Sequence, residues 1–326
     1  MPIDAYSLCP GGTGKKIKFC CPDLLPELEK ISRMTEGDQF VAALSHVEHL
    51  LGKQPDRACL LALRSDLLRR VGRFDELASN AERFLKAHPE NQLAWAESAI
   101  AAAASGDHRR AIECVYRAME FVDGNLYSVT YEAMSIAAQA AAAHKAWGAV
   151  LALLRSQIAV NASDTAARRS IAEVHSHVSI PLLQRCGMDK APVEDGAPWA
   201  GRLHEALTMV LKGQFHKAEE KLTALAAETP DKPTPWQWLA EIRSALADTQ
   251  GEAEALQRLA TLDLPWDDAV EAGARAMLIA DDPLGDSVDM LRIIWAVEDA
   301  EQVETAIRLD QRAWVMPNDE ARHDGD

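Results

Sequence analysis

Three cysteines stand close together near the start of the chain, at Cys9, Cys20 and Cys21. Thiolates are soft metal ligands, and a cluster of them in one short segment is more typical of a metal site than of a disulfide framework. The sequence therefore predicts a site in which these three residues hold a metal. The remaining cysteines fall within helical patterns, where a cysteine usually packs as a small buried hydrophobe: Cys59, Cys114 and Cys186.

The segment between these cysteines reads Gly11-Gly12-Thr13-Gly14-Lys15-Lys16. With its cysteines it resembles the SEC-C motif, a small zinc-binding module of the preprotein translocase ATPase SecA and of many bacterial proteins. The family pattern is Cys-x-Cys, eight residues, then Cys-Cys or His-Cys. The resemblance implies zinc bound by Cys9, Cys20 and Cys21. Gly11 stands at the second cysteine position, so the fourth ligand would be water, Asp23 or a residue of another chain; the alternative is a metal-free knuckle packed against the first repeat.

Residues 1–24 contain this segment, and we call them the knuckle. The knuckle is locally basic because it carries Lys15, Lys16 and Lys18. The chain as a whole has a formal net charge of -16, which excludes a whole-surface nucleic-acid binder because phosphates would be repelled. The resemblance implies docking on an acidic protein surface, as the SEC-C module of SecA docks on the chaperone SecB. A phosphate backbone is the other candidate, and a merely solvated loop is the third.

The glycine-rich centre of the knuckle is not a phosphate-binding loop. That loop requires a glycine five residues before Gly14, where Cys9 stands, and a hydroxyl residue where the chain has Lys16. No His-Glu-x-x-His, Gly-x-Ser-x-Gly or dinucleotide fingerprint is present. We therefore expect no catalytic residues and no enzyme activity.

The rest of the chain repeats with a period of 34 residues, which separates Gly72 from Gly106 and Pro55 from Pro89. Apolar spacing predicts helices over 58–71, 74–87, 93–105 and 108–121. This pattern resembles the tetratricopeptide family, best over residues 58–123. The resemblance implies an all-α fold, a right-handed solenoid of antiparallel helix pairs.

The repeat pattern weakens and returns along the chain. The unit at 37–55 keeps only its second half, and the helix pair over 126–160 has no glycine at its corner. Helices are expected again over 199–211, 235–246 and 252–262. We expect this organisation: the knuckle at 1–24, repeats at 25–186, a linker at 187–198, further repeats at 199–264, capping helices at 265–316 and a disordered tail at 317–326.

Tetratricopeptide arrays bind ligands on a concave face made by the first helices, so the resemblance implies a groove here. The residues expected to line it are mostly small or apolar: Ala62, Asp66, Arg69, Arg70, Leu93, Ala96 and Ile100. An amphipathic helix of a partner, or of the chain's own carboxy-terminal segment, would suit such a groove.

The function expected from these features is a cytoplasmic, non-catalytic protein-interaction scaffold. No signal peptide or membrane span is recognisable, which favours the cytoplasm. The alternative is a ribosome- or nucleic-acid-associated factor that binds phosphate through the basic knuckle.

Overall fold

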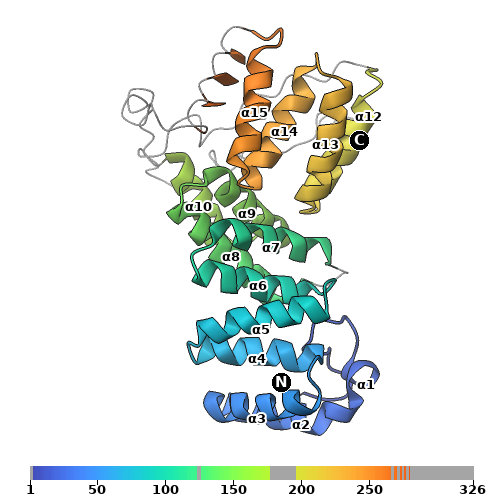
Figure 1. The fold of residues 1–326 in the computed structure, drawn as a ribbon, viewed down its shortest axis with the longest axis vertical. Helices are drawn as coiled ribbons and strands as arrows, with labels where there is room; N and C mark the ends of the chain where they lie inside the picture. The colour runs from blue at the N-terminus through green and yellow to red at the C-terminus, as the bar shows by residue number, and fades with distance from the viewer. Residues whose placement is uncertain are drawn as a thin grey trace. The chain divides into compact units, whose positions relative to one another are not determined.

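A computed structural model of the chain describes residues 3–122, 126–176 and 196–265 and scattered positions up to Ile279. Within these residues every regular element is helical, which confirms the all-α fold class (Figure 1). The chain forms two compact units, Met1–Ala140 and Ala141–Asp326. Cys186, most of the expected linker and capping helices, and the tail at 317–326 lie outside the described residues.

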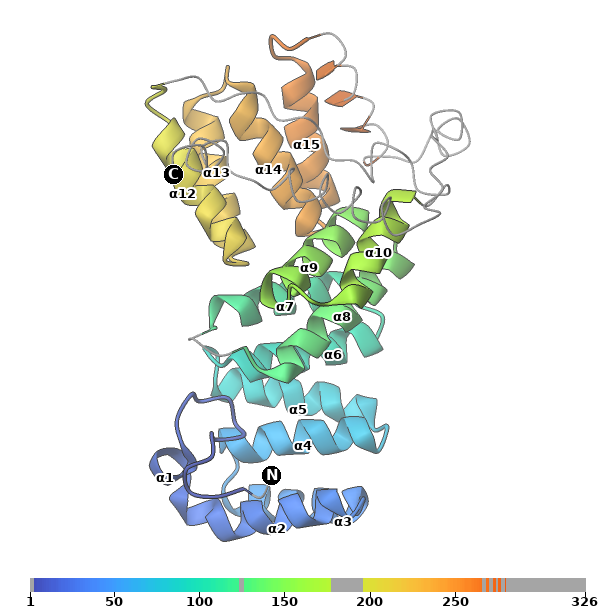
Figure 2. The ribbon, with the colours of Figure 1, turned by 180° about the vertical axis from the view of Figure 1, so that it is seen from behind.

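The first unit is a stack of helix hairpins that follows the knuckle along the chain. Its helices are α2 (Leu25–Glu36), α3 (Phe40–Lys53), α4 (Ala58–Arg70), α5 (Phe74–Ala87), α6 (Gln92–Ala104), α7 (His108–Glu120) and α8 (Ser128–Ala143), the last of which runs into the second unit. Each helix from α2 to α6 packs against the one that follows it (Figure 2). The four helices predicted between 58 and 121 are confirmed to within one residue at each end. Helix α2 completes the hairpin of which the sequence showed only the second half.

The 34-residue period is set by the corner between the two helices of each hairpin. The backbone φ angle is positive at Asp38, Gly72 and Gly106, which are spaced by 34 residues, and again at Lys145 in the second unit. This left-handed conformation suits glycine and costs other residues about 1–2 kcal/mol, because their Cβ approaches the backbone. The corner is therefore conformationally the same in each case, although glycine marks only some of the corners in the sequence.

Lys145→Gly is expected to raise the free energy of unfolding by about 1 kcal/mol, because it removes this clash from an exposed position whose φ is 58°. The reverse change, Gly72→Ala, is expected to lower it by a similar amount, since the space around Gly72 is open and only the backbone is strained. Urea unfolding followed by circular dichroism measures both. A destabilised Lys145→Gly protein would contradict the assignment of this corner.

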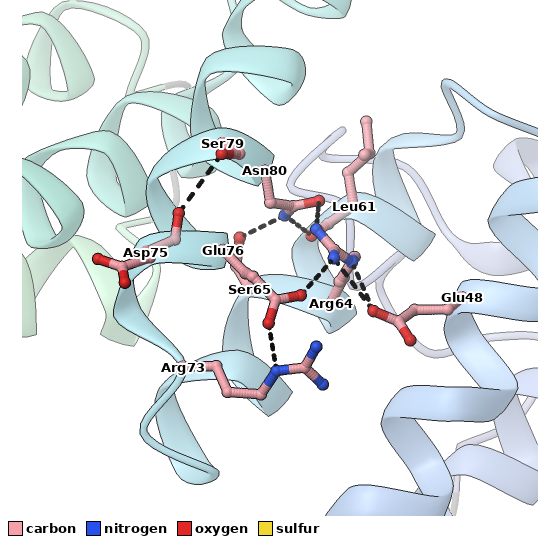
Figure 3. Close-up of polar contacts among 9 residues, drawn as sticks. All are labelled: Glu48, Leu61, Arg64, Ser65, Arg73, Asp75, Glu76, Ser79 and Asn80. Carbon is pink, nitrogen blue, oxygen red and sulfur yellow. Dashed lines mark hydrogen bonds and ion pairs between the residues drawn. The ribbon is translucent and has the colours of Figure 1, made fainter.

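A polar network joins α3, α4 and α5 (Figure 3). Asn80 on α5 is 2% exposed, and its Nδ2 donates to Ser65 Oγ and to a backbone carbonyl of α4, both at 2.9 Å. Arg64 on α4 reaches Glu48 on α3 at 3.0 Å and Glu76 on α5 at 3.3 Å. Since buried polar groups are costly unless they are paired, these contacts favour one register of the three helices over its alternatives.

The second unit contains α9 (Trp147–Val160), α10 (Thr165–Ser176), α12 (Ala200–Leu211), α13 (Phe215–Glu228), α14 (Pro233–Ala245) and α15 (Thr249–Ala260). Helices α12 to α15 pack in chain order, whereas α9 packs against both α10 and α14. A Cβ at Gly148 of α9 would lie 2.0 Å from Ser244 Oγ of α14, so the close approach of these helices requires glycine. No helix in the described parts of the chain is long and apolar enough to cross a membrane.

Candidate metal centre in the knuckle

The described part of the knuckle, residues 3–24, is a loop followed by two short helical turns. An antiparallel β-bridge between Leu8 and Lys16 closes the loop, and the backbone N–H of Cys9 donates to the carbonyl of Lys15 at 2.8 Å. Helix α1 (Ile17–Cys20) and the 3₁₀ turn η1 (Pro22–Leu24) follow directly. This closure brings the beginning of the loop to the end of α1, where the next two cysteines stand.

The sulfur atoms of Cys9, Cys20 and Cys21 lie within 4.8 Å of one another. Those of Cys9 and Cys21 are 3.5 Å apart, and Thr13 Oγ1 donates to the Cys20 sulfur at 3.3 Å. A disulfide would bring two sulfurs to about 2.0 Å, so these are separate thiols. Four sulfurs at about 2.3 Å from one zinc ion are about 3.8 Å apart, so the Cys9–Cys21 spacing suits a shared metal.

A fourth thiol, which the sequence did not indicate, lies beside this cluster of three. Cys59 lies in the first turn of α4, is 2% exposed, and is close enough to Cys9 and Cys21 to interact with both thiols. The sequence predicted its burial, but not its neighbours. No spacing rule relates it to the knuckle, and the one available signal was the glycine at position 11, which leaves the ligand set one thiol short.

Contact among the thiols moves their pKa values in opposite directions. The interaction with Cys59 lowers the pKa of Cys9, and this effect outweighs burial, which acts in the opposite direction. Burial raises the pKa of Cys21 to about 12. The pKa of Cys59 is also raised, first by its hydrogen bond with Cys9 and then by burial. A lowered pKa favours the thiolate form, which is the form of cysteine that binds metals.

The knuckle is docked on the repeats by polar contacts on two helices. The carbonyl of Gly11 accepts a hydrogen bond of 2.7 Å from Asn91 Nδ2, and Asn91 also caps the start of α6. Asp23 of η1 forms an ion pair of 2.8 Å with Arg57, the residue before α4. The Asp23 carboxylate, which was a possible fourth metal ligand on the sequence alone, is thus paired with Arg57.

The three knuckle lysines form a surface with two aromatic rings. Lys15 and Lys16 are exposed, and Lys18 Nζ lies 4.2 Å from the ring centroid of Tyr6 and 4.7 Å from that of Phe19. Tyr6 is 65% exposed and Phe19 is 72% exposed. We call these five residues the basic face. Tyr6 was not singled out in the sequence because it precedes the motif.

The seven expected groove residues lie on α4 and α6, but few of them reach solvent. Four apolar ones are buried in the helix packing: Ala62, Leu93, Ala96 and Ile100. Arg69 is 13% exposed and is paired with Glu97 at 3.3 Å and Glu132 at 2.6 Å. Arg70 is about half exposed and pairs with Asp66 at 2.8 Å. The polar part of this surface that meets solvent is therefore Asp66 and Arg70.

Together the fold and the cluster define an all-α helical-repeat protein with a thiol-rich knuckle. No family model matches the sequence, and no curated protein matches it. The structure is similar to a crystal structure of a tetratricopeptide repeat protein from Parabacteroides merdae ATCC 43184, with 13% identity, coverage of 87% of this chain and 97% of that one, and a TM-score of 0.38. The fold described above supports the assignment of helical repeats, and the residues of the knuckle carry the resemblance to the SEC-C motif.

Proposed function

We propose that the chain is a non-catalytic scaffold that binds protein partners, with the helical repeats as its frame and the basic face of the knuckle as a contact surface. The basic face carries the proposal. It places two lysine ammonium groups and two exposed rings together on a chain whose net charge is -16. A partner with an acidic surface would be attracted to this positive region and would find aromatic surface there to bury.

The arrangement of Lys18 supports a role in recognition. Its ammonium lies near the rings of both Tyr6 and Phe19, which restricts a side chain that is otherwise flexible. Side chains ordered before binding lose less entropy when the complex forms. Large aromatic residues are also enriched at the energetic centres of protein interfaces.

Zinc is the proposed cofactor, and the knuckle thiols support this assignment. Cys9, Cys20 and Cys21 are soft ligands with spacing that suits a tetrahedral ion, and the burial of Cys9 and Cys21 is typical of a structural rather than a catalytic site. Zinc bound there would hold the end of α1 against the loop. The basic face lies on these same two segments, so the ion would stabilise the contact surface without performing chemistry.

A second contact with the face formed by α4 and α6 remains part of the proposal. Asp66 and Arg70 are its solvent-facing polar residues, and the buried apolar positions beneath them maintain the helix packing. We expect this face to add area to an interface that is centred on the basic face.

The test is capture of partners from lysate by three forms of the protein. Lys15→Glu, Lys16→Glu and Lys18→Glu together should weaken partner binding at least about tenfold, because attraction at the basic face becomes repulsion. The control combines Lys30→Glu, Lys53→Glu and Lys86→Glu, which change the net charge equally at exposed positions outside the knuckle. Equal losses in both variants would attribute the effect to net charge and would contradict a role for the basic face.

Treating the lysate with nuclease separates the two kinds of partner. Partners retained after nuclease are bound as proteins, as we propose. Partners lost after nuclease, together with binding of the pure protein to duplex DNA or RNA, would instead support the ribosome- or nucleic-acid-associated function. Binding through three phosphate contacts to duplex DNA would also weaken with salt, with a logarithmic slope of about -3.

A further inference from the structure

We propose that Cys59 is the fourth ligand of the metal centre, so that one zinc ion bound by Cys9, Cys20, Cys21 and Cys59 fastens the knuckle to the first turn of α4. This inference goes beyond the scaffold function and does not depend on partner binding. It rests on the zinc site proposed for the three knuckle thiols, which it completes.

The first argument is the contact between the knuckle loop and α4. A Cβ built at Gly11 would lie 2.4 Å from the backbone nitrogen of Cys59 and 2.6 Å from the carbonyl carbon of Ala58. Both distances are far shorter than a side chain permits. The loop therefore lies directly against the first turn of α4, and no residue larger than glycine fits at position 11. The loop itself cannot supply a thiol there, whereas α4 supplies one from Cys59.

The second argument is that four thiols converge from three separate elements. Cys9 comes from the loop, Cys20 and Cys21 from the end of α1, and Cys59 from α4. The Cys59 thiol is close enough to those of Cys9 and Cys21 to interact with both. Isolated buried thiols such as Cys114 on α7 have no thiol neighbour of this kind. A structural zinc ion takes four ligands in a closed tetrahedron, and Cys59 would complete that number beside the three clustered thiols.

The third argument is the enclosure of the cluster. The exposed fractions of Cys9, Cys21 and Cys59 are 1%, 0% and 2%. Water is a poor fourth ligand for an ion in so enclosed a setting, because little solvent reaches these three residues. Cys20 is the one partly exposed member, and it leaves a route by which the metal can enter.

Charge near Cys59 is compatible with a thiolate ligand. Four thiolates around Zn²⁺ carry a net charge of about -2, which needs nearby positive groups. Arg57 precedes α4, and its charge interacts with Cys59 and Cys21. Cys59 is also the second residue of the helix, where unpaired N–H groups and the helix dipole favour a negative charge. The zinc ion would thus be held where α4 offers both a ligand and compensation for its charge.

The experiment is a count of sulfur ligands in the full-length protein purified without chelators. X-ray absorption of the bound zinc should show four sulfur neighbours at about 2.3 Å in the unaltered chain. Cys59→Ser should leave three and weaken zinc binding on the order of a hundredfold, since one of four ligands is lost. The matched control is Cys114→Ser, which removes another buried thiol outside the cluster and should leave both values unchanged.

Each outcome decides the inference. Three sulfurs and one lighter atom in the unaltered protein, or unchanged zinc affinity in Cys59→Ser, would overturn the assignment of Cys59 while leaving zinc on the three knuckle thiols. Less than about one fifth of a zinc ion per chain would overturn the zinc site itself. Neither result bears on partner binding, which the lysine variants test. If Cys59→Ser does not fold, the sulfur count of the unaltered protein still decides.

Discussion

Arg69→Met is expected to lower the free energy of unfolding of the first unit by about 3–5 kcal/mol at about pH 9. Arg69 on α4 places its guanidinium 3.3 Å from Glu97 on α6, whose side chain is 3% exposed. Removing the cation leaves this buried carboxylate without a counter-charge. Breaking one side of a buried ion pair is among the most costly single changes in a folded protein, because the remaining charge keeps its desolvation penalty.

The cost should depend on pH with a definite sign. Burial raises the pKa of Glu97 to about 8 and nearby Asp66 and Glu132 add to this effect, while Arg69 opposes it. The folded chain thus retains a proton that the unfolded chain releases near its ordinary pKa of 4.5. The stability that protonated Glu97 contributes is fully present below pH 4.5 and is lost as the pH rises through about 8. Arg69→Met removes the one opposing charge, so its cost should be smaller at about pH 6, where Glu97 is protonated.

Urea unfolding at these two pH values measures the effect, with Arg70→Met as the matched control. Arg70 is the next residue, is 49% exposed, and pairs with Asp66 at the surface, so its loss should cost less than about 1 kcal/mol. Replacing Glu97 by methionine together with Arg69 should restore much of the stability, since no buried charge is then left. If Arg69→Met and Arg70→Met cost the same at both pH values, the buried pair is not what stabilises this part of the stack.

The helices between 58 and 121 could be predicted because local signals determine their ends. Gly72 and Gly106 mark the corners, and Pro89 prevents α5 from continuing, so no tertiary contact was needed to place these boundaries. The corners at Asp38 and Lys145 use the same backbone conformation without glycine. There the packing of the flanking helices compensates for the strain, and such compensation is not visible in the residue itself.

The packing of α9 against α14 could not be predicted from the period. A repeat pattern implies contacts between neighbouring helices, whereas these two are separated by several helices along the chain. The only trace in the sequence is Gly148, whose missing side chain permits the approach to Ser244. A single glycine inside a helix does not identify its partner.

The thiol cluster was partly predictable for a related reason. Cys9, Cys20 and Cys21 are close along the chain, so their spacing was enough to group them. Cys59 joins them only because the knuckle folds back onto α4, and the sequence holds no rule for that docking. Asn91, which fixes the loop at Gly11, is a recognisable helix cap, but its second hydrogen bond depends on the same tertiary contact.

Removal of zinc by a chelator is expected to release the knuckle while the helices farther along the chain remain folded. Within the described knuckle, few large apolar side chains are buried, chiefly Ile17 and Leu24. Such a small core offsets little of the entropy of ordering the segment, so we expect the proposed zinc to supply most of its stability. Repeat arrays are stabilised by contacts between neighbours, and this limits how far the loss spreads.

Hydrogen exchange measures this release at individual backbone amides. The N–H groups of Cys9, Ile17 and Cys21 donate within the knuckle at 2.8 to 2.9 Å, and their exchange should accelerate at least about a thousandfold when zinc is removed. Amides in α13 should not change, because this helix belongs to the other unit. Cys114→Ser should behave like the unaltered chain, since its thiol lies outside the cluster. Unchanged exchange in the knuckle would show a fold that needs no metal, whereas acceleration throughout α4 to α7 would show that the ion stabilises the whole first unit, because those helices then depend on the docked knuckle.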